Sequence, residues 1–248
     1  MKNIKMRGFE VKKFGFTLAE VLITLSIVGV VTAMTVPSLM MNAQKKSWAN
    51  ALATQITNFE NATKNLIVEE DALDLFETKL CDIELKYEDL PKYLKNLETY
   101  NEENFLEFYN DKIFKIDKTL YVDEKLSNIQ NFSLKNGGTT FIYNLKNYND
   151  DYKYTEKESI EKGLNFRGAI ADVVIDVNGK NLPNTLGRDI FQFIMDENGK
   201  LHAVGSKSYA NFMNNENLYW TKTCADDNKG SGDACTGRLV EKNFVMDY

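Results

Sequence analysis

The sequence predicts an α+β fold in which one long N-terminal helix precedes an antiparallel β-sheet. Residues 16–41 are almost entirely apolar, and apolar residues then recur at spacings of mostly three or four as far as Leu66. That spacing is typical of an amphipathic helix. Short runs rich in β-branched and aromatic residues follow later, separated by Asn and Gly turns. Helix first and strands afterwards is the element order of an α+β domain.

Composition limits the classes of protein that the chain can represent. It has 248 residues, 43% apolar and 27% charged, with 14 glycines and 3 prolines. These values leave room for one ordinary domain with an appendage and exclude collagen-like, mucin-like and wholly disordered chains. The net charge of −6 disfavours a nucleic-acid partner, because phosphate contacts need clustered Lys and Arg.

The residues that most enzymes use are scarce. The chain has one histidine, His202, and 3 cysteines, which leaves little material for zinc sites or histidine-based catalysis. No P-loop, dinucleotide motif or nucleophile elbow is present in the sequence. We therefore predict that the chain is not an enzyme and that His202, which follows a hairpin turn, is structural.

A basic leader opens the chain and an apolar segment follows it. Residues 1–15 contain five basic residues against Glu10 alone, and residues 16–41 contain one ionisable side chain, Glu20. As a helix the apolar segment reaches about 39 Å, enough to cross a bilayer. The positive flank predicts a single-pass inner-membrane protein with its N-terminus in the cytoplasm and its head outside it.

Two general interpretations of this segment explain it incompletely. A cleaved secretory signal has an apolar stretch of about 7–15 residues and a small-residue cleavage site, and neither feature is present. A plain signal anchor explains the length and the orientation. It leaves Glu20 without a partner, although a carboxylate within hydrocarbon costs about 2–3 kcal/mol.

The residues at the junction resemble a known signal. The string KKFGFTLAEVLITLSIVGVVTAM, residues 12–34, is similar to the prepilin signal of type IV pilins and type II secretion pseudopilins. In that family a prepilin peptidase cuts after the glycine and methylates the new N-terminus. The resemblance therefore implies cleavage between Gly15 and Phe16, with Glu20 as the fifth residue of the mature chain, where the family keeps a glutamate.

Glu20 is then predicted to act in filament assembly. The new α-amino group at Phe16 has a reference pKa of about 7.7–8.0 and is mostly cationic. Glu20 of a neighbouring subunit would neutralise it, which makes the pair a contact that sets the register of a helical filament. The alternative is that Glu20 lies within one turn of the interface and reaches water.

The resemblance also implies a domain organisation and a pilin-like fold. We expect a leader at 1–15, a long helix at 16–68 whose first part, 16–41, is the transmembrane segment and filament core, and a globular head at 69–248. Pro37 predicts a local kink without ending the helix. One helix face is predicted to pack on the sheet of the head; its residues are Trp48, Leu52, Ile56, Phe59 and Leu66.

The elements of the head are predicted from local patterns. The segment after the long helix predicts short helices at 73–80 and 90–100 and strands at 114–116 and 119–122. The sheet pattern that follows predicts a hairpin turn at 196–199, and strands at 139–145, 169–177, 190–196 and 201–205.

A loop rich in Asp, Asn and Gly, residues 176–191, has two interpretations. Such residues form tight turns that satisfy their own backbone. Some pseudopilins, by resemblance, carry Ca²⁺ in the head, and oxygen atoms here could surround that ion. The spacing does not match an EF-hand. The candidate ligands are Asp176, Asn178, Asn184 and Asp189.

Two cysteines bracket a second such loop near the C-terminus. Cys224 and Cys235 enclose ten residues rich in Gly and Asp, and the predicted head lies where thiols can be oxidised. We predict a disulfide between them, as pilin heads often have. Cys81 is the third cysteine and could replace either partner. A weaker calcium candidate lies inside the loop, formed by Asp226, Asp227, Asn228 and Asp233.

These observations together predict a structural subunit of a type IV pilus or a type II secretion pseudopilus. The implied partners are prepilin peptidase, other pilin or pseudopilin subunits, the inner-membrane assembly machinery and membrane lipid. The long segment after the helix favours a minor pilin or a pseudopilin over a compact major pilin. The alternatives are a membrane-anchored binding protein that does not polymerise, calcium-dependent or not, and an anchored hydrolase that uses acidic residues.

Overall fold

The computed structural model describes most of the chain after the leader. The described residues are 15–78, 80, 97–99, 113–120, 129–134, 138–144, 169–179, 181–222, 224, 232 and 234–248. The chain divides into two compact units, Met1–Gln44 and Lys45–Tyr248. The predicted leader, apart from Gly15, lies outside the described residues.

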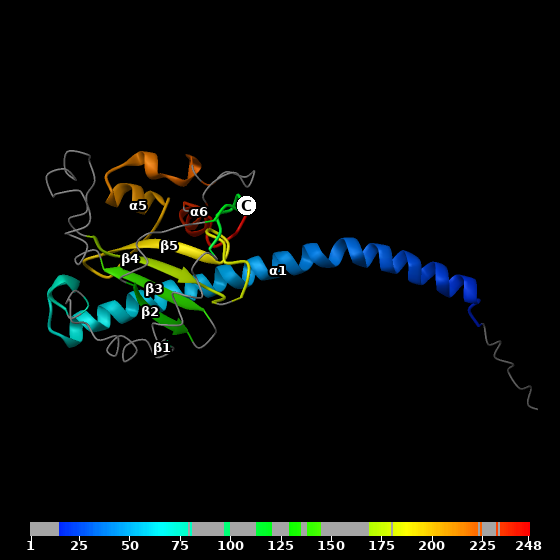
Figure 1. The fold of residues 1–248 in the computed structure, drawn as a ribbon, viewed down its shortest axis with the longest axis horizontal. Helices are drawn as coiled ribbons and strands as arrows, with labels where there is room; N and C mark the ends of the chain where they lie inside the picture. The colour runs from blue at the N-terminus through cyan, green and yellow to red at the C-terminus, as the bar shows by residue number, and fades with distance from the viewer. Residues whose placement is uncertain are drawn as a thin grey trace, which may run out of the picture. The chain divides into compact units, whose positions relative to one another are not determined.

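One helix, α1 (Leu18–Glu69), extends through the predicted helical region (Figure 1). It begins two residues later and ends one residue later than the predicted boundaries at 16 and 68. Pro37 lies inside the helix without ending it, as predicted. Proline removes one backbone hydrogen bond, and a helix of this length retains enough others to continue.

In the first unit the apolar side chains of α1 are exposed. By length and composition α1 contains a segment apolar enough to cross a membrane, and none of that segment is buried within the structure. A helix of a soluble domain buries its apolar side chains against the rest of the domain. Exposed apolar side chains along a long helix instead suit contact with membrane lipid or with other helices. The most exposed large apolar residues of this part of α1 include Leu18, Met34, Leu39 and Met40, and Phe16, just before the helix, is exposed as well.

The head contains a six-stranded sheet whose strands are neighbours in sequence order and pair antiparallel throughout. Figure 1 shows the strands side by side. The sheet is therefore a meander in which the β2–β3 and β5–β6 connections are short, whereas longer stretches of chain separate β1 from β2, β3 from β4 and β4 from β5. The strands are β1 (Leu97–Thr99), β2 (Ile129–Leu134), β3 (Thr139–Asn144), β4 (Ala169–Asp176), β5 (Ile190–Asp196) and β6 (Leu201–Ala203).

The four strands predicted in this region are confirmed as β3, β4, β5 and β6, with ends that differ from the prediction by at most two residues. Cross-strand pairs such as Ile142 with Val173 and Val173 with Phe193 fix the register. The predicted turn between β5 and β6 is also present, because the Gly199 amide donates to the Asp196 carbonyl oxygen at 2.9 Å. Gly199 has φ +76°, which glycine adopts without strain.

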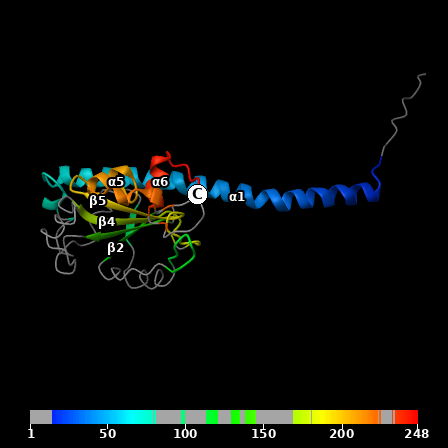
Figure 2. The ribbon, with the colours of Figure 1, turned by 90° about the horizontal axis from the view of Figure 1, so that it is seen from above.

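The second part of α1 packs on one face of the sheet (Figure 2). Leu52, Phe59 and Leu66 are buried against residues of β4 and β5, and Trp48 and Ile56 pack beside them, so the predicted helix face is confirmed. On β4 the alternate residues Ala171, Val173 and Ile175 form the facing side of this core. Each large apolar side chain buried here contributes about 1.5–3 kcal/mol.

The turn between β5 and β6 abuts α1 closely. Thr63 donates its hydroxyl to the Gly199 carbonyl oxygen at 3.2 Å, and Glu60 accepts the Leu201 amide at 3.0 Å. A Cβ atom on Gly199 would lie 2.3 Å from the Thr63 hydroxyl oxygen. Glycine is therefore required at this position both by its φ angle and by the approach of the helix.

The predicted helix over 90–100 is wrong where the structure describes it. Residues 97–99 form strand β1, whose Leu97 pairs with Leu134 of β2. Strand β2 itself was not predicted from the sequence. Both errors have one cause: pairing with a neighbouring strand supplies backbone hydrogen bonds that local propensity does not record.

Two other predicted elements are shorter than expected. The helix at 73–80 is reduced to the 3₁₀ turn η1 (Leu75–Glu77), where the Asp74 side chain accepts the Phe76 amide. The strands at 114–116 and 119–122 are reduced to an isolated bridge between Phe114 and Leu120, with residues 121–122 outside the described part. Asp117 caps the turn between them by accepting the Thr119 amide and hydroxyl, which leaves too few residues for a ladder.

The C-terminal part adds elements that the sequence pattern did not reveal. Ser206 caps the short helix α5 by accepting the Tyr209 amide at 3.0 Å. Helix α6 approaches the chain so closely that a Cβ on Gly237 would lie 2.0 Å from the Ser206 nitrogen. The elements are α5 (Lys207–Phe212), η6 (Glu216–Leu218), η7 (Trp220–Lys222) and α6 (Cys235–Glu241).

Candidate functional site

The N-terminus of α1 is closed by a reciprocal pair, Thr17 and Glu20. Glu20 Oε2 accepts the Thr17 amide at 2.8 Å and the Thr17 hydroxyl at 2.9 Å. In return, the Glu20 amide donates to Thr17 Oγ1 at 3.2 Å. This is the capping-box arrangement, in which a threonine before the helix and a glutamate three residues later satisfy each other's backbone donors. The glutamate predicted for assembly therefore also caps its own helix.

The predicted cleavage position lies just before this cap. Gly15, Phe16 and Thr17 have no regular secondary structure, and the Phe16 side chain is exposed. A Cβ atom on Gly15 would meet nothing within 4 Å. Nothing in the described fold therefore requires glycine at residue 15, so its identity has to be explained by something other than packing.

Three hydroxyl side chains in the apolar part of α1 are satisfied within the helix. Thr24 donates its hydroxyl to the Val21 carbonyl oxygen and Ser26 donates to that of Leu22, at 3.0 and 2.8 Å. Thr35 bonds to Val31 in the same way. Unpaired hydroxyl groups are costly in hydrocarbon, so this pattern suits a helix with apolar surroundings.

Comparison with known families agrees with the N-terminal geometry. Residues 11–36 match the prokaryotic N-terminal methylation motif. The segment is thus a prepilin signal of the type IV pilin and pseudopilin kind. Such a signal implies processing by prepilin peptidase and assembly with other pilins. No curated protein and no solved structure matches the chain significantly. Together with the apolar helix, the sheet and the C-terminal disulfide, the signal gives the chain a pilin-like α+β layout.

The loop after β4 brings its predicted residues into one hydrogen-bonded turn. Asp176 Oδ1 accepts the amides of Asn178 and Gly179 at 3.0 and 2.8 Å. Asp189 accepts the Asn184 amide at 2.8 Å and the Thr185 amide at 2.6 Å, one on each carboxylate oxygen. Both carboxylates are fully buried and serve the backbone, which is the structural-turn interpretation of this loop.

Some polar atoms of the same loop have no partner. Asn184 is fully buried with φ +48°, and within the described residues neither its amide oxygen nor its amide nitrogen has a hydrogen bond. The Asn178 amide oxygen is also unpaired there. Amide oxygens are suitable ligands for Ca²⁺. Among the same residues, however, no three His, Cys, Asp or Glu side chains are grouped to hold a metal. Calcium at this loop stays a prediction.

Burial changes the acidity of this site. Desolvation raises the pKa of Asp189 above its ordinary value, and the amides of Thr185 and Asn184 partly oppose that shift by stabilising the charged form. The backbone amides are the positive dipoles that the structure itself supplies.

The predicted disulfide between Cys224 and Cys235 is confirmed, with an S–S distance of 2.01 Å and Cα atoms 5.0 Å apart. Cys235 is the first residue of α6, so the bond ties the loop to a helix that is buried in the head. Cys81 lies outside the described residues and does not replace either partner. The four acidic and amide residues proposed inside the loop also lie outside them.

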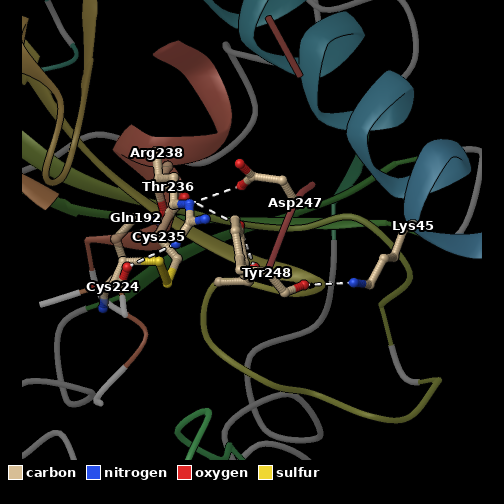
Figure 3. Close-up of a disulfide and its surroundings, with 9 residues drawn as sticks. Lys45, Gln192, Cys224, Cys235, Thr236, Arg238, Asp247 and Tyr248 are labelled. Atoms are coloured by element: carbon tan, nitrogen blue, oxygen red, sulfur yellow. Dashed lines mark hydrogen bonds and ion pairs between the residues drawn. A yellow bond between two sulfur atoms is a disulfide. The ribbon is translucent and has the colours of Figure 1, made fainter. Parts of the chain in front are cut away.

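The last residues of the chain pack around this disulfide (Figure 3). Tyr248 donates its hydroxyl to the carbonyl oxygens of Gly187 and Cys235, at 2.7 and 3.1 Å. Lys45, from α1, donates to the main-chain oxygen of Tyr248 at 2.5 Å. Burial raises the pKa of the Tyr248 hydroxyl well above its ordinary value, so this group remains a donor. The C-terminal residues thus join the disulfide region to the long helix.

Arg238 is the cation at the centre of this cluster. Its Nη1 atom donates to the Cys224 carbonyl oxygen at 3.1 Å, and its Nε atom lies 2.8 Å from Asp247. The guanidinium also lies over the rings of Trp220 and Tyr248. The hydrogen bond from Arg238 lowers the pKa of Asp247. No local sequence pattern indicates this cluster, because its residues are far apart along the chain and belong to no motif.

The histidine predicted to be structural lies on β6 and is buried. His202 Nε2 is 2.9 Å from Asp196 Oδ2, and Nδ1 is 2.8 Å from the Ser208 hydroxyl. Its ring stacks on Phe212, with centroids 4.5 Å apart. Both ring nitrogens therefore have partners, as a buried histidine requires.

Proposed function

We propose that this chain is a structural subunit of a type IV pilus or of a type II secretion pseudopilus. The single observation that carries the proposal is the methylation motif at residues 11–36. An exposed apolar helix segment and an α+β head with a C-terminal disulfide support it. In this proposal the chain is first inserted in the inner membrane, with its head outside the cytoplasm, and is then assembled into a filament.

Processing is the first step of the proposed function. Prepilin peptidase cuts between Gly15 and Phe16 and methylates the Phe16 amine. Removal of the leader takes away five basic residues and one acid, so the formal charge changes from −6 to −10. The mature protein then has a hydrophobic, capped helix at its N-terminus.

Assembly is the second step. The Phe16 ammonium group of one subunit pairs with Glu20 of a neighbour in the filament, where each charge offsets the other's insertion into an apolar environment. The capping hydrogen bonds from Thr17 hold the Glu20 carboxylate at the first turn of α1, which supports a role for this charge close to the N-terminal end of the helix. The inner-membrane assembly machinery is the partner that supplies subunits.

We favour a minor pilin or a pseudopilin within this class, because a long segment separates the helix from the main strands. The second candidate is a membrane-anchored binding protein that never polymerises. It would retain residues 1–15, and its function would not depend on the charge of Glu20. Its support is the large head, which offers surface for a ligand or partner.

The deciding experiment compares the protein recovered from membranes with and without active prepilin peptidase. Intact mass and N-terminal sequencing should show an N-methylated Phe16 only when the peptidase is active. Gly15→Val is the matched variant, because a side chain at residue 15 meets nothing within 4 Å and leaves the fold intact. An uncut chain in the presence of the peptidase would reject the filament proposal and favour the anchored binding protein.

A further inference from the structure

Three polar residues from separate parts of the head form a linear hydrogen-bonded relay. Asp196 ends β5, His202 lies on β6 and Ser208 lies on α5. The imidazole connects the other two, with 2.9 Å to Asp196 and 2.8 Å to the Ser208 hydroxyl. This order of carboxylate, imidazole and hydroxyl is that of a serine nucleophile with its base and positioning acid.

The protonation pattern of the relay follows from its partners. A carboxylate accepts hydrogen bonds only, so the nitrogen that faces Asp196, Nε2, carries the hydrogen in the neutral ring. Nδ1 then has a lone pair, and the Ser208 hydroxyl donates to it. This is the tautomer in which an imidazole can take a proton from serine.

Asp196 is held ionised and in place. Its Oδ1 atom accepts the amides of Asn198 and Lys200, at 2.9 and 3.0 Å, while Oδ2 faces His202. Burial by itself would raise the pKa of Asp196, but the hydrogen bonds from His202, Lys200 and Asn198 outweigh burial and lower it. Asp196 is therefore a positioning residue that fixes the tautomer of the ring.

His202 and Ser208 differ in their exposure to solvent. His202 is buried, and Phe212 stacks on its ring at an interplanar angle of 16°, which restricts rotation. Ser208 is exposed on the surface of α5. A base shielded from water beside an accessible hydroxyl is the arrangement that favours reaction at the hydroxyl.

We propose that Ser208 is a reactive serine that accepts acyl groups from activated esters, with His202 as the general base. The Ser208 oxygen attacks the ester carbonyl and forms a new C–O bond, and its proton passes to His202 Nδ1. The bond from the carbonyl carbon to the leaving oxygen breaks, and the leaving oxygen takes the proton from His202 Nδ1. The products are an O-acylated Ser208 and the alcohol, with no change in oxidation state.

The test uses p-nitrophenyl acetate on the purified full-length chain. Acetylation of each serine is followed by peptide mass spectrometry, and Ser47 is the internal control, because it is exposed on α1 and has no histidine beside it. We expect acetylation of Ser208 at least about tenfold faster than that of Ser47, since a positioned base contributes about 10²–10⁴-fold. Equal rates at the two serines would overturn the proposal.

Two variants of the base separate chemistry from fold. His202→Asn keeps an acceptor near the position of Nδ1, and His202→Gln keeps a donor near Nε2, but neither side chain is basic. Each should reduce acetylation of Ser208 to the rate of Ser47, and Ser208→Ala should remove the signal. A variant that unfolds near the same temperature as the unchanged chain and still reacts rapidly at Ser208 would overturn the proposal. If both variants unfold, the proposal is tested by the ratio of the acetylation rates of Ser208 and Ser47 in the unchanged chain.

The role of Asp196 has a spectroscopic test of its own. Because the chain contains one histidine, the imidazole ¹⁵N signals in its NMR spectrum come from His202 alone. We expect the neutral ring to carry its hydrogen on Nε2, and Asp196→Asn to change that tautomer population and slow the acetylation of Ser208. A ring with its hydrogen on Nδ1 in the unchanged chain would contradict the assigned base.

Discussion

Glu20 accepts both the backbone amide and the hydroxyl of Thr17, at 2.8 and 2.9 Å. One carboxylate oxygen therefore caps the helix that the chain would use in a filament. The same group is proposed to pair with the N-terminus of a neighbouring subunit. Because Glu20 has two roles, one substitution must remove its charge while keeping the cap, and another must weaken the cap while keeping the charge.

Glu20→Gln should leave processing intact and abolish incorporation into filaments. The glutamine amide oxygen still accepts from Thr17, but the charge that neutralises a neighbouring N-terminus is absent. Processing is measured by intact mass and incorporation by the fraction of protein in sheared filaments. Thr17→Val is the matched variant: it keeps the charge, loses the hydroxyl part of the cap, and should weaken the helix end by about 0.5–2 kcal/mol. Normal filaments from Glu20→Gln would instead support the interpretation that Glu20 reaches water.

Loss of the disulfide should destabilise the head. Cys224 and Cys235 are 11 residues apart, and closing a loop of that size contributes about 3 kcal/mol in the chain-entropy model. Cys224→Ser and Cys235→Ser should each lower the free energy of unfolding in urea by about that amount. The double variant should equal the single ones, because one bond is removed in each case. A difference below about 1 kcal/mol would show that the packing around Arg238 holds the loop without the bond.

Gly237→Ala should destabilise the contact between α6 and the turn after β6. The added Cβ would lie 2.0 Å from the Ser206 nitrogen and 2.2 Å from the Gly205 carbonyl carbon, and backbone atoms cannot move aside cheaply. We expect a loss of about 1–3 kcal/mol or more in unfolding free energy. Gly29→Ala is the matched control, since a Cβ there meets nothing within 4 Å. Equal stability of Gly237→Ala and the unchanged chain would refute this close approach.

Protonation of Asp196 should make the head less stable in acid. Its pKa is lower in the folded chain than the ordinary value of about 4. Near that pH the unfolded chain binds more protons, so the stabilisation is complete above about pH 4 and is lost as the pH falls through the folded-state pKa. Urea unfolding of the unchanged chain and of Asp196→Asn should differ most near neutral pH and converge in strong acid. A difference that stays constant over this range would contradict the lowered pKa.

Asp189→Asn should destabilise the loop after β4 whether or not calcium is present. The two carboxylate oxygens each accept a backbone amide. Asparagine has one acceptor oxygen, and its NH2 group would face the other backbone N–H as a second donor. The expected loss is about 1–3 kcal/mol, measured by thermal unfolding in EDTA and in calcium chloride. We expect the midpoint of the unchanged chain to be the same in both solutions. A rise with calcium that Asp189→Asn removes would assign an ion to this loop.

Local sequence patterns were most informative where one physical requirement dominates. The apolar run predicted the long helix, and the residues from Lys12 onward indicated the prepilin signal. The strands from Thr139 onward were predictable because they are short runs rich in β-branched and aromatic residues, bounded by Asn and Gly turns. The pairing of Cys224 with Cys235 agreed with the spacing of the loop that they close.

Predictions failed where the structure of a segment depends on a partner that is distant in the sequence. Leu97 is in a strand because it pairs with Leu134, and nothing near Leu97 reveals that partner. Arg238 is placed by Cys224, Asp247 and two aromatic rings, a set that no local motif predicts.

The sequence by itself determined the prepilin signal, the long helix, the main strands and the disulfide, because each depends on residues close together or on a regular period. Only the tertiary structure decided which groups meet in the head: Asp196 with His202 and Ser208, and Tyr248 with Cys235. These contacts depend on how the strands and the last helix pack. Packing is set by the summed burial of many side chains, which no short stretch of sequence contains.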